Sequence, residues 1–331
     1  MYKGLILTQN PDIPETALIK ALAEEFHITV LSKNSLSEVN ARFLAHSFNN
    51  KFDIRALFKI KDAYDFALCF DGKCVTTAIL LKIFKKVRSL FVYRGTPSGG
   101  NWLDPISWLT FRSPWIDKII VNCHHIKNYF ITQGLAPEKI CVIYKGHESK
   151  WYERTNPYRG GDFVTILNYR KSKGLENVIC FVKKFFPRSS LTVFGRIPEA
   201  IKKRYSNNVR FEGYREQPFA FLPSFKIFIL LSEKEGIPKS AVEATFKGLP
   251  LILYDTGGIS EIWSNNDAVI LNDINEVPTP TISLIEELLC NEQKRRELNE
   301  KALQKVESKL DFRTYVYKHI ELIYNALSGK K

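Results

Sequence analysis

The sequence predicts an α/β protein with two Rossmann-like, doubly wound domains, each a parallel sheet covered by helices on both faces. Its 331 residues are too many for one ordinary compact domain and suit two. Short apolar runs alternate with helical patterns along most of the chain, as in βαβ units. The stretch 151–161, WYERTNPYRGG, interrupts this alternation with Asn-Pro and Gly-Gly. We therefore expect domains at 1–153 and 162–311, joined by a linker at 154–161.

Apolar runs and helical periodicity place the elements of the first half. The expected strands are Gly4–Thr8, Ile28–Ser32, Phe66–Phe70, Ser89–Tyr93, Lys118–Asn122 and Cys141–Tyr144. The expected helices are Pro14–Phe26, Thr76–Val87 and a segment around Ile126–Gln133. Gln9-Asn10-Pro11 follows the first strand, where a dinucleotide-binding domain carries G-x-G-x-x-G. The interpretation of the chain as a dinucleotide-dependent dehydrogenase therefore loses its main support.

The second half repeats the alternation. Its expected strands are Phe163–Leu167, Leu191–Phe194, Asn208–Phe211, Lys226–Leu231, one just before Gly257-Gly258, and Ala268–Leu271. Its expected helices are Leu175–Phe185, a short one from Pro238 to the stop at Gly248, Leu284–Leu289, Gln293–Leu310 and Phe312–Leu327. Asp311 is the expected cap of the last helix.

Composition narrows the class of partner. There are 48 Lys and Arg against 35 Asp and Glu, a formal net charge of +13. This balance suits a nucleotide, a phosphorylated lipid, a membrane surface or nucleic acid, although a Lys-rich solvated surface explains it as well. None of the six cysteines forms a C-x-x-C pair, so we expect buried free thiols and no zinc site.

The expected location is cytoplasmic or peripheral to the cytoplasmic membrane. The apolar run Gly4–Leu7 is too short for a signal peptide, and no apolar stretch approaches the roughly 18 residues of a spanning helix. The segment 76–88 is amphipathic and carries Lys82, Lys85, Lys86 and Arg88. It can lie on anionic lipid or be the wet face of an ordinary sheet-covering helix.

Several loops expected at the carboxyl ends of strands are rich in cations or glycine, and ligands of open α/β sheets bind at that edge. The loop Arg94–Asn101 starts with an arginine and is glycine-rich, which suits a phosphate or is an unremarkable surface turn. The loop Asn168–Gly174 carries Arg170 and Lys173 before a helix N-terminus, which predicts a polyphosphate contact.

The stretch Leu231–Trp263 carries the most chemistry. Its two carboxylates, Glu235 and Glu243, bracket the start of the short helix, whose first amides form an anion site. A carboxylate can accept two hydrogen bonds from a vicinal diol such as a ribose. The alternative for Glu243 is an exposed i, i+4 ladder with Lys239 and Lys247.

With these motifs the chain resembles the retaining GT-B glycosyltransferases of family 4. The resemblance covers most of the second half closely and the first half loosely. It is carried by EGIPKSAVEATFKGLPLI and DTGGISEI around the two glutamates, KSKGLENVI at 171–179, VRFEGY at 209–214 and IYKGHESKWY at 143–152.

The resemblance implies roles for particular residues. Glu243 would hold the ribose of a nucleotide-sugar donor, and Glu235 would touch hydroxyls of the transferred sugar. Lys173, with Arg170, would neutralise the departing diphosphate, and Arg94 stands where the family often has a histidine. The remaining expected donor-binding residues are Gly236, Ile237, Pro238, Gly195, Arg196 and Tyr214. Asn168 stands at the place of the family's usual arginine.

The resemblance further implies two domains facing a cleft and a last helix, 312–327, that packs back on the first domain. It implies a metal-independent, hexosyl-type transferase with no cofactor, whose substrate is a UDP- or GDP-linked sugar. The acceptor would be a hydroxyl of a glycan or lipid-linked glycan. Two alternatives remain: a nucleotide-sugar epimerase of the same fold, and a non-catalytic protein that binds an anionic ligand. Nucleic acid is the weaker partner, since no aromatic–basic repeat occurs.

Overall fold

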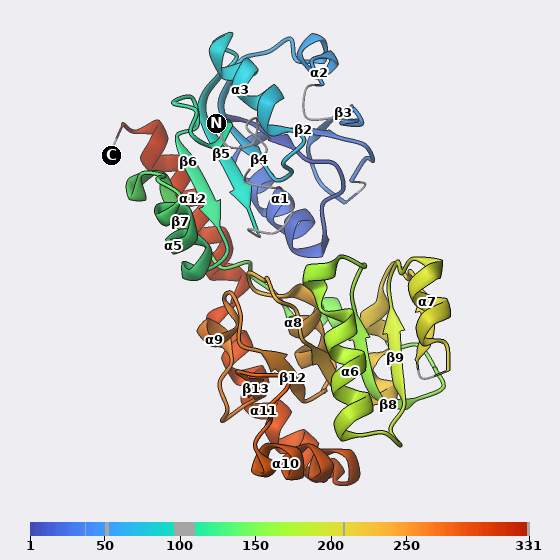
Figure 1. Cartoon of the computed structure of the whole chain (residues 1–331). Coiled ribbons are helices and arrows are strands. Elements are labelled where there is room, and N and C mark those ends of the chain that lie inside the picture. The colour runs from blue at the N-terminus through green and yellow to red at the C-terminus, as the bar shows by residue number, and fades with distance from the viewer. Residues whose placement is uncertain (37, 50–52, 96–109, 208, 330–331) are drawn as a thin grey trace. The chain divides into compact units, whose positions relative to one another are not determined.

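The computed structural model describes residues 1–331 except 37, 50–52, 96–109, 208 and 330–331. The chain forms two compact units (Figure 1). Unit 1 is Met1–His147 together with Leu310–Lys331, and unit 2 is Glu148–Lys309. Each unit contains one parallel sheet with its own helices, so the predicted class of two doubly wound α/β halves is confirmed.

The sheet of unit 1 has seven parallel strands in the order β3-β2-β1-β4-β5-β6-β7. Its strands are β1 Lys3–Leu7, β2 His27–Ser32, β3 Arg42–Ala45, β4 Tyr64–Cys69, β5 Val87–Arg94, β6 Lys118–Val121 and β7 Ile140–Val142. Its helices are α1 Ile13–Glu25, α2 Arg55–Lys59, α3 Val75–Ile83, α5 His124–Thr132, the short 3-10 helix η1 Pro137–Lys139, and α12 Phe312–Leu327. The strands β1, β4 and β5 are buried in its centre because both faces are covered.

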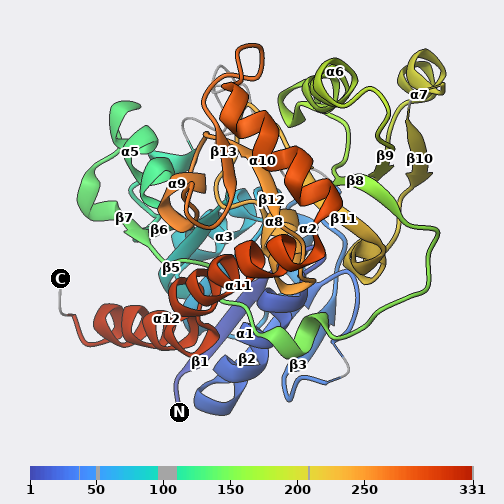
Figure 2. The same cartoon turned by 90° about the horizontal axis from the view of Figure 1, so that it is seen from below.

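The last helix, α12, completes unit 1 although it lies far along the sequence. The Asp311 side chain accepts a hydrogen bond from the amide of Thr314, so the predicted N-cap is confirmed. Figure 2 shows α12 running beside α1, and its Ile323 and Leu327 belong to the same core as β1 and β4. Unit 1 is therefore closed by the C-terminal segment of the chain.

A buried polar cluster fixes α12 against the sheet. The hydroxyl of Tyr93, at the end of β5, lies 3.0 Å from the Tyr315 hydroxyl and 3.1 Å from Nε2 of His319. The Nδ1 atom of His319 lies 2.7 Å from the Tyr315 carbonyl oxygen. Burial lowers the pKa of His319 to about 4. The ring is therefore neutral at pH 7 and serves as a hydrogen-bonding group.

The sheet of unit 2 has six parallel strands in the order β10-β9-β8-β11-β12-β13. Its strands are β8 Gly161–Ile166, β9 Leu191–Phe194, β10 Arg210–Gly213, β11 Phe225–Leu230, β12 Leu251–Tyr254 and β13 Val269–Leu271. Its α-helices are α6 Leu175–Phe185, α7 Glu199–Tyr205, α8 Lys239–Phe246, α9 Ile259–Ile262, α10 Thr279–Cys290 and α11 Glu292–Lys309. The 3-10 helices are η2 Ser149–Tyr152, η3 Lys171–Lys173 and η4 Pro218–Ser224.

Some boundaries differ from those expected. Residues 149–152, expected in the first domain, pack within unit 2 because Tyr152 stacks on Phe246, with ring centroids 5.0 Å apart. Helix α3 ends at Ile83 instead of Val87: Lys85 adopts a left-handed conformation (φ 55°), and the chain turns directly into β5. Cys180 and Cys290 are exposed, so the expectation of buried thiols is wrong for these two.

Protonation of His319 predicts a pH-dependent loss of stability. The folded-state pKa is lowered from 6.5 to about 4, so the unfolded chain takes up this proton first as the pH falls. The neutral His319 ring contributes fully to the free energy of unfolding above pH 6.5. This contribution decreases towards pH 4, by on the order of 3 kcal/mol. Urea unfolding of the wild type and of His319→Gln at pH 7 and pH 5 checks this. The difference in free energy of unfolding between wild type and His319→Gln should be smaller at pH 5 than at pH 7. The control His27→Gln, at an exposed position, should not change with pH in this way. A difference that is equal at both pH values would contradict the assignment.

Candidate active site at the carboxyl edge of the second sheet

The predicted donor-site residues of unit 2 follow strands of one sheet at one edge. Arg170 and Lys173 follow β8, and the glutamate loop follows β11. Gly195, Arg196 and Tyr214 follow β9 and β10. Because β10, β9, β8 and β11 are successive neighbours and all parallel, their carboxyl ends meet at the same edge.

The centre of this edge is an ion pair between two predicted residues. The ammonium of Lys173 lies 2.7 Å from Oε1 of Glu235. Glu235 is only 3% exposed, whereas the side chain of Lys173 is 26% exposed. The buried carboxylate therefore has a cationic partner, and the lysine keeps part of its surface for another anion.

Backbone contacts fix the loops that carry this pair. The amide of Glu233 donates to the Ser172 carbonyl at 2.9 Å, and the Ser232 hydroxyl donates to the Lys173 carbonyl at 3.2 Å. On the other side, the Thr256 hydroxyl donates to the Glu233 carbonyl at 2.9 Å. The loops after β8, β11 and β12 are thus held as one assembly.

Two glycines allow these loops to approach so closely. Both adopt positive φ, +64° at Gly174 and +65° at Gly257. A Cβ at Gly174 would lie 1.8 Å from the Leu231 carbonyl oxygen, and one at Gly257 would lie 1.9 Å from that of Glu235. No other residue fits without displacement of the neighbouring backbone.

Helix α8 places the second glutamate inward. Glu243 is buried, 4% exposed, and its Oε1 lies 3.4 Å from the ammonium of Lys239. The ammonium of Lys247 instead donates to the carbonyl oxygens of Tyr152 and Arg154 at 2.6 and 3.0 Å. Of the alternative i, i+4 ladder, the Lys239–Glu243 pair is therefore present, but the exposed position of Glu243 and its pair with Lys247 are wrong. Pro238 is the N-cap of α8, one position before its predicted place.

Asn168 has a role that the sequence did not reveal. Its side-chain oxygen accepts a hydrogen bond of 2.9 Å from the amide of Arg196, and the Tyr169 amide donates 2.9 Å to the Arg196 carbonyl. These two bonds join the loops after β8 and β9. Arg170 is exposed at the N-cap of η3, three residues before Lys173 in the same loop.

A pocket of about 450 Å³ opens at the β9 and β10 end of this edge. Three of its lining residues were predicted, namely Gly195, Arg196 and Tyr214. The Arg196 guanidinium lies over the Tyr214 ring, 4.2 Å from its centroid, and forms a flat cationic surface. Tyr169 and Lys202 also line the pocket and were missed. Tyr169 stands beside the flagged Arg170, whereas Lys202 lies on α7, a helix that the sequence pattern did not indicate.

In unit 1, Arg94 ends β5 and is half-buried. Its guanidinium carbon lies 4.9 Å from the centroid of the Phe111 ring. Burial lowers its pKa. Among the described residues its Nε atom has no hydrogen-bond partner. The predicted glycine-rich loop after it, from Thr96 on, lies outside the described residues.

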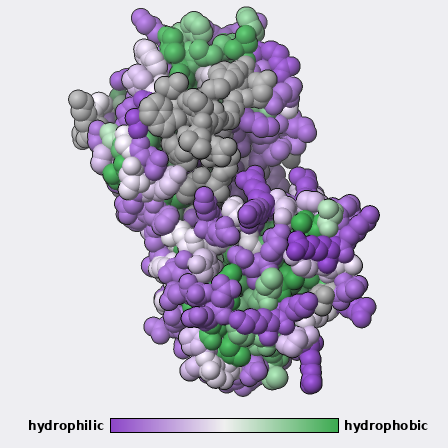
Figure 3. Space-filling view, viewed as in Figure 1, coloured by the Kyte–Doolittle hydropathy of each residue, from purple (hydrophilic) through white to green (hydrophobic). Residues whose placement is uncertain are grey.

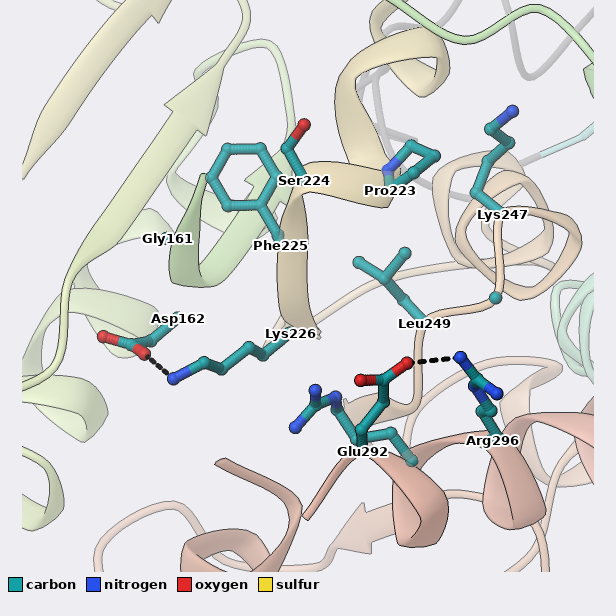
Figure 4. Close-up of a pocket in the computed structure, with 12 residues that line it drawn as sticks. Gly161, Asp162, Pro223, Ser224, Phe225, Lys226, Lys247, Leu249, Glu292 and Arg296 are labelled. Atoms are coloured by element: carbon teal, nitrogen blue, oxygen red, sulfur yellow. Dashed lines mark hydrogen bonds and ion pairs between the residues drawn. The ribbon is translucent and has the colours of Figure 1, made fainter. Parts of the chain in front are cut away.

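A second pocket of unit 2, about 550 Å³, lies at the opposite edge of the sheet (Figure 4). Its residues come from the starts of β8 and β11 and from the approach to β12. Lys226 pairs with Asp162 at 2.8 Å, and Arg296 pairs with Glu292. Lys226 and Arg296 are thus already paired with carboxylates, and the pocket contains none of the predicted site residues. We assign it no ligand.

Within the described ranges, no group of three or more His, Cys, Asp or Glu side chains is arranged to hold a metal ion. None of the helices that the structure describes combines the length and the hydrophobicity needed to cross a bilayer.

Comparison with solved structures shows which fold the chain has. Over 98% of this chain and all of the other, the structure matches that of Anabaena HepE in complex with UDP-glucose, with a TM-score of 0.77 and 15% identity. It also matches sucrose-phosphate synthase from Thermosynechococcus elongatus, over 99% of this chain and all of the other, with a TM-score of 0.79 and 13% identity. Identities this low establish the fold alone. The chain has the two-domain GT-B fold of glycosyltransferases.

A family match comes from unit 2. Residues 157–305 match the family model described as glycosyl transferases group 1. The O-antigen biosynthesis glycosyltransferase WbnH of Escherichia coli is 33% identical over 121 residues, 35% of this chain and 34% of that protein. The matched segment thus spans about a third of this curated relative.

The turn at Gly257 yields a stability prediction. Gly257→Ala combines a left-handed backbone with a Cβ contact of 1.9 Å to the Glu235 carbonyl oxygen. Gly248→Ala has a similar φ of +82° but no atom within 4 Å of its Cβ. We expect Gly248→Ala to cost roughly 1–2 kcal/mol and Gly257→Ala clearly more, measured by thermal unfolding. Equal losses of stability in the two variants would contradict this, because they would show that the backbone around Gly257 moves to accommodate the new Cβ at no cost.

Proposed function

We propose that this protein is a retaining glycosyltransferase that moves a hexose from a UDP- or GDP-linked donor to a hydroxyl of a glycan or lipid-linked glycan. The observation that carries the proposal is the Lys173–Glu235 pair beside the N-terminus of α8. It lies at the same edge of one sheet as the pocket at Arg196 and Tyr214. The group 1 glycosyl transferase match of this unit supports the same reaction class.

The order of the strands suggests how the donor lies. β10 and β11 are separated by β9 and β8, and three strand spacings amount to about 14 Å. A single sugar ring cannot reach both ends, but a nucleoside diphosphate sugar can extend along the edge. In this arrangement the base occupies the pocket of Arg196 and Tyr214. The sugar lies at Glu235.

Glu243 holds the ribose in this proposal. Its carboxylate is buried on α8 beside Lys239, in a position to accept hydrogen bonds from the two ribose hydroxyls. Glu235 accepts hydrogen bonds from hydroxyls of the transferred sugar. The backbone N–H groups of Gly236 and Ile237, and those that follow Pro238 at the start of α8, face the sugar and diphosphate.

Lys173 stabilises the leaving diphosphate. An ammonium has three N–H donors, and one of them is directed to Glu235, so the others can bind phosphate oxygens at the same time. Arg170, exposed in the same loop, adds charge. As the bond from the anomeric carbon to the phosphate oxygen breaks, negative charge grows on the phosphate, and fixed cations are most effective at that moment.

The acceptor hydroxyl attacks on the face that the diphosphate leaves, and its proton passes to a phosphate oxygen. The new glycosidic bond keeps the configuration of the donor, and no protein nucleophile is needed. In this mechanism the positive charge comes from Lys173, Arg170 and the α8 amides, without a bound metal ion. Activity unchanged by a chelator is the expected result. Arg94 is the proposed contact of unit 1 with the acceptor or with developing charge.

A variant of Glu243 tests the donor site. Wild type should be stabilised thermally by one UDP- or GDP-linked hexose in a panel, by roughly 2.7 kcal/mol at 100 times its Kd. Glu243→Gln should bind that donor about tenfold to a hundredfold less tightly, since a charged hydrogen-bond acceptor is lost. Glu300→Gln, on the exposed surface of α11, is the matched control and should bind normally.

The products formed from the same donor distinguish a glycosyltransferase from a nucleotide-sugar epimerase. Transfer to an acceptor with the anomeric configuration of the donor, read by NMR, is the expected outcome. An epimerised nucleotide sugar from donor alone would overturn the proposal, as would unchanged affinity and turnover in Glu243→Gln.

Lys173 should matter more for turnover than for binding. Lys173→Met should lower kcat by about a hundredfold to a thousandfold, because the charge that it stabilises appears in the transition state. Donor affinity should fall less. Lys183→Met, an exposed change on α6, controls for loss of surface charge. A fall in affinity alone, with kcat unchanged, would show that Lys173 only binds.

A further inference from the structure

Unit 1 exposes large apolar side chains at one site, on α2 and on the turn that ends α3. Ile54 is 53% exposed and Phe58 79%, and on the α3 side Ile83 is 40% exposed and Phe84 63%. We call these four residues the α2/α3 surface. Figure 3 shows hydrophobic side chains gathered at this end of the molecule. Burial in the protein does not explain them, since Ile54, Phe58 and Phe84 are each more than half exposed and Ile83 is 40% exposed.

The two parts of this surface are held side by side. Near the start of both helices, the Thr77 hydroxyl donates to the Asp53 carbonyl at 2.9 Å. Near their ends, the Lys86 ammonium donates to the Lys61 carbonyl at 2.6 Å. The segments therefore run in the same direction, and Phe58 and Phe84 come shortly before the residues of the second bond. The helices α2 and α3 also pack on each other (Figure 1).

The cations around this surface fall into two groups. Arg55 pairs with the buried Asp53, Arg42 pairs with Asp62, and Lys82 pairs with Asp117. Lys59 and Lys86 instead donate to the carbonyl oxygens of Ala45 and Lys61, which neutralise no charge. Lys61 and Lys85 are exposed in the same two segments. The aromatic side chains are thus bordered by four lysines whose charge no carboxylate in these segments balances.

We propose that the α2/α3 surface docks on an anionic lipid bilayer. Phe58 and Phe84 would enter the boundary between headgroups and acyl chains, while Lys59, Lys61, Lys85 and Lys86 lie against the headgroups. Exposed aromatic groups bordered by lysines are the composition that such a boundary favours. A second copy of the chain fits less well, because a symmetric contact would bring the two sets of lysines together. The proposal does not depend on the donor chemistry.

Sedimentation with vesicles tests it, using the whole protein. Wild type should bind phosphatidylcholine vesicles that contain phosphatidylglycerol and should bind pure phosphatidylcholine far less. Phe58→Ser/Phe84→Ser should reduce binding to the anionic vesicles by at least about tenfold. The matched control is Tyr317→Ser, an aromatic residue on α12 that is 64% exposed. It should leave binding unchanged.

Charge reversal separates this surface from the general basicity of the chain. Lys61→Glu/Lys85→Glu should weaken binding by at least about tenfold, whereas Lys183→Glu/Lys203→Glu, on exposed positions of unit 2, should have little effect. Thermal unfolding confirms that each variant is folded. Equal losses for both lysine pairs, or binding that ignores Phe58 and Phe84, would overturn the proposal. Self-association of wild type that the phenylalanine variant abolishes would assign the surface to a second copy instead.

Discussion

A buried carboxylate needs a compensating cation, and in unit 2 the ion pair of Glu235 with Lys173 meets that need at the edge where four strands end. Removing Glu235 from water would be unfavourable alone. The ammonium at 2.7 Å offsets the cost and at the same time joins the loop after β11 to the loop after β8. Hydrogen bonds from Ser232, Glu233 and Thr256 hold the same loops. The proposed donor site is thus preorganised, and little rearrangement is needed when a substrate binds.

Unit 1 has similar ion pairs between a lysine and carboxylates at the carboxyl edge of its own sheet. Lys145, shortly after β7, contacts Asp12 at 2.9 Å and Glu15 at 2.7 Å at the start of α1. Burial lowers the pKa of Lys145, but the two carboxylates more than offset that effect and the pKa is raised. Close by, Tyr93 and His319 attach α12. In each unit, therefore, a lysine from one carboxyl-end loop pairs with one or two carboxylates that follow another strand.

Much of the fold could be predicted because local signals agree with it. Leu175–Phe185, Leu191–Phe194 and Phe312–Leu327 have the predicted bounds, and the Asp311 cap was readable from one side chain. The helix around Thr76–Val87 was predicted too long. Its apolar periodicity continues past Ile83, but the strand that starts at Val87 requires a turn at Lys85. That turn leaves Phe84 in solvent, where the pattern had suggested a packed face.

By itself the sequence determined the two parallel α/β sheets, the carboxyl-end loops and the residue types in them, since these depend on periodicity, glycine and local caps. Only the tertiary structure decided that Glu243 is buried rather than exposed on a ladder, that Lys173 faces Glu235, and that Asn168 binds the backbone of Arg196. The partners in the Lys173–Glu235 and Asn168–Arg196 contacts are 62 and 28 residues apart in the chain. No local pattern encodes such distances, because they follow from the order in which the strands pair across the sheet.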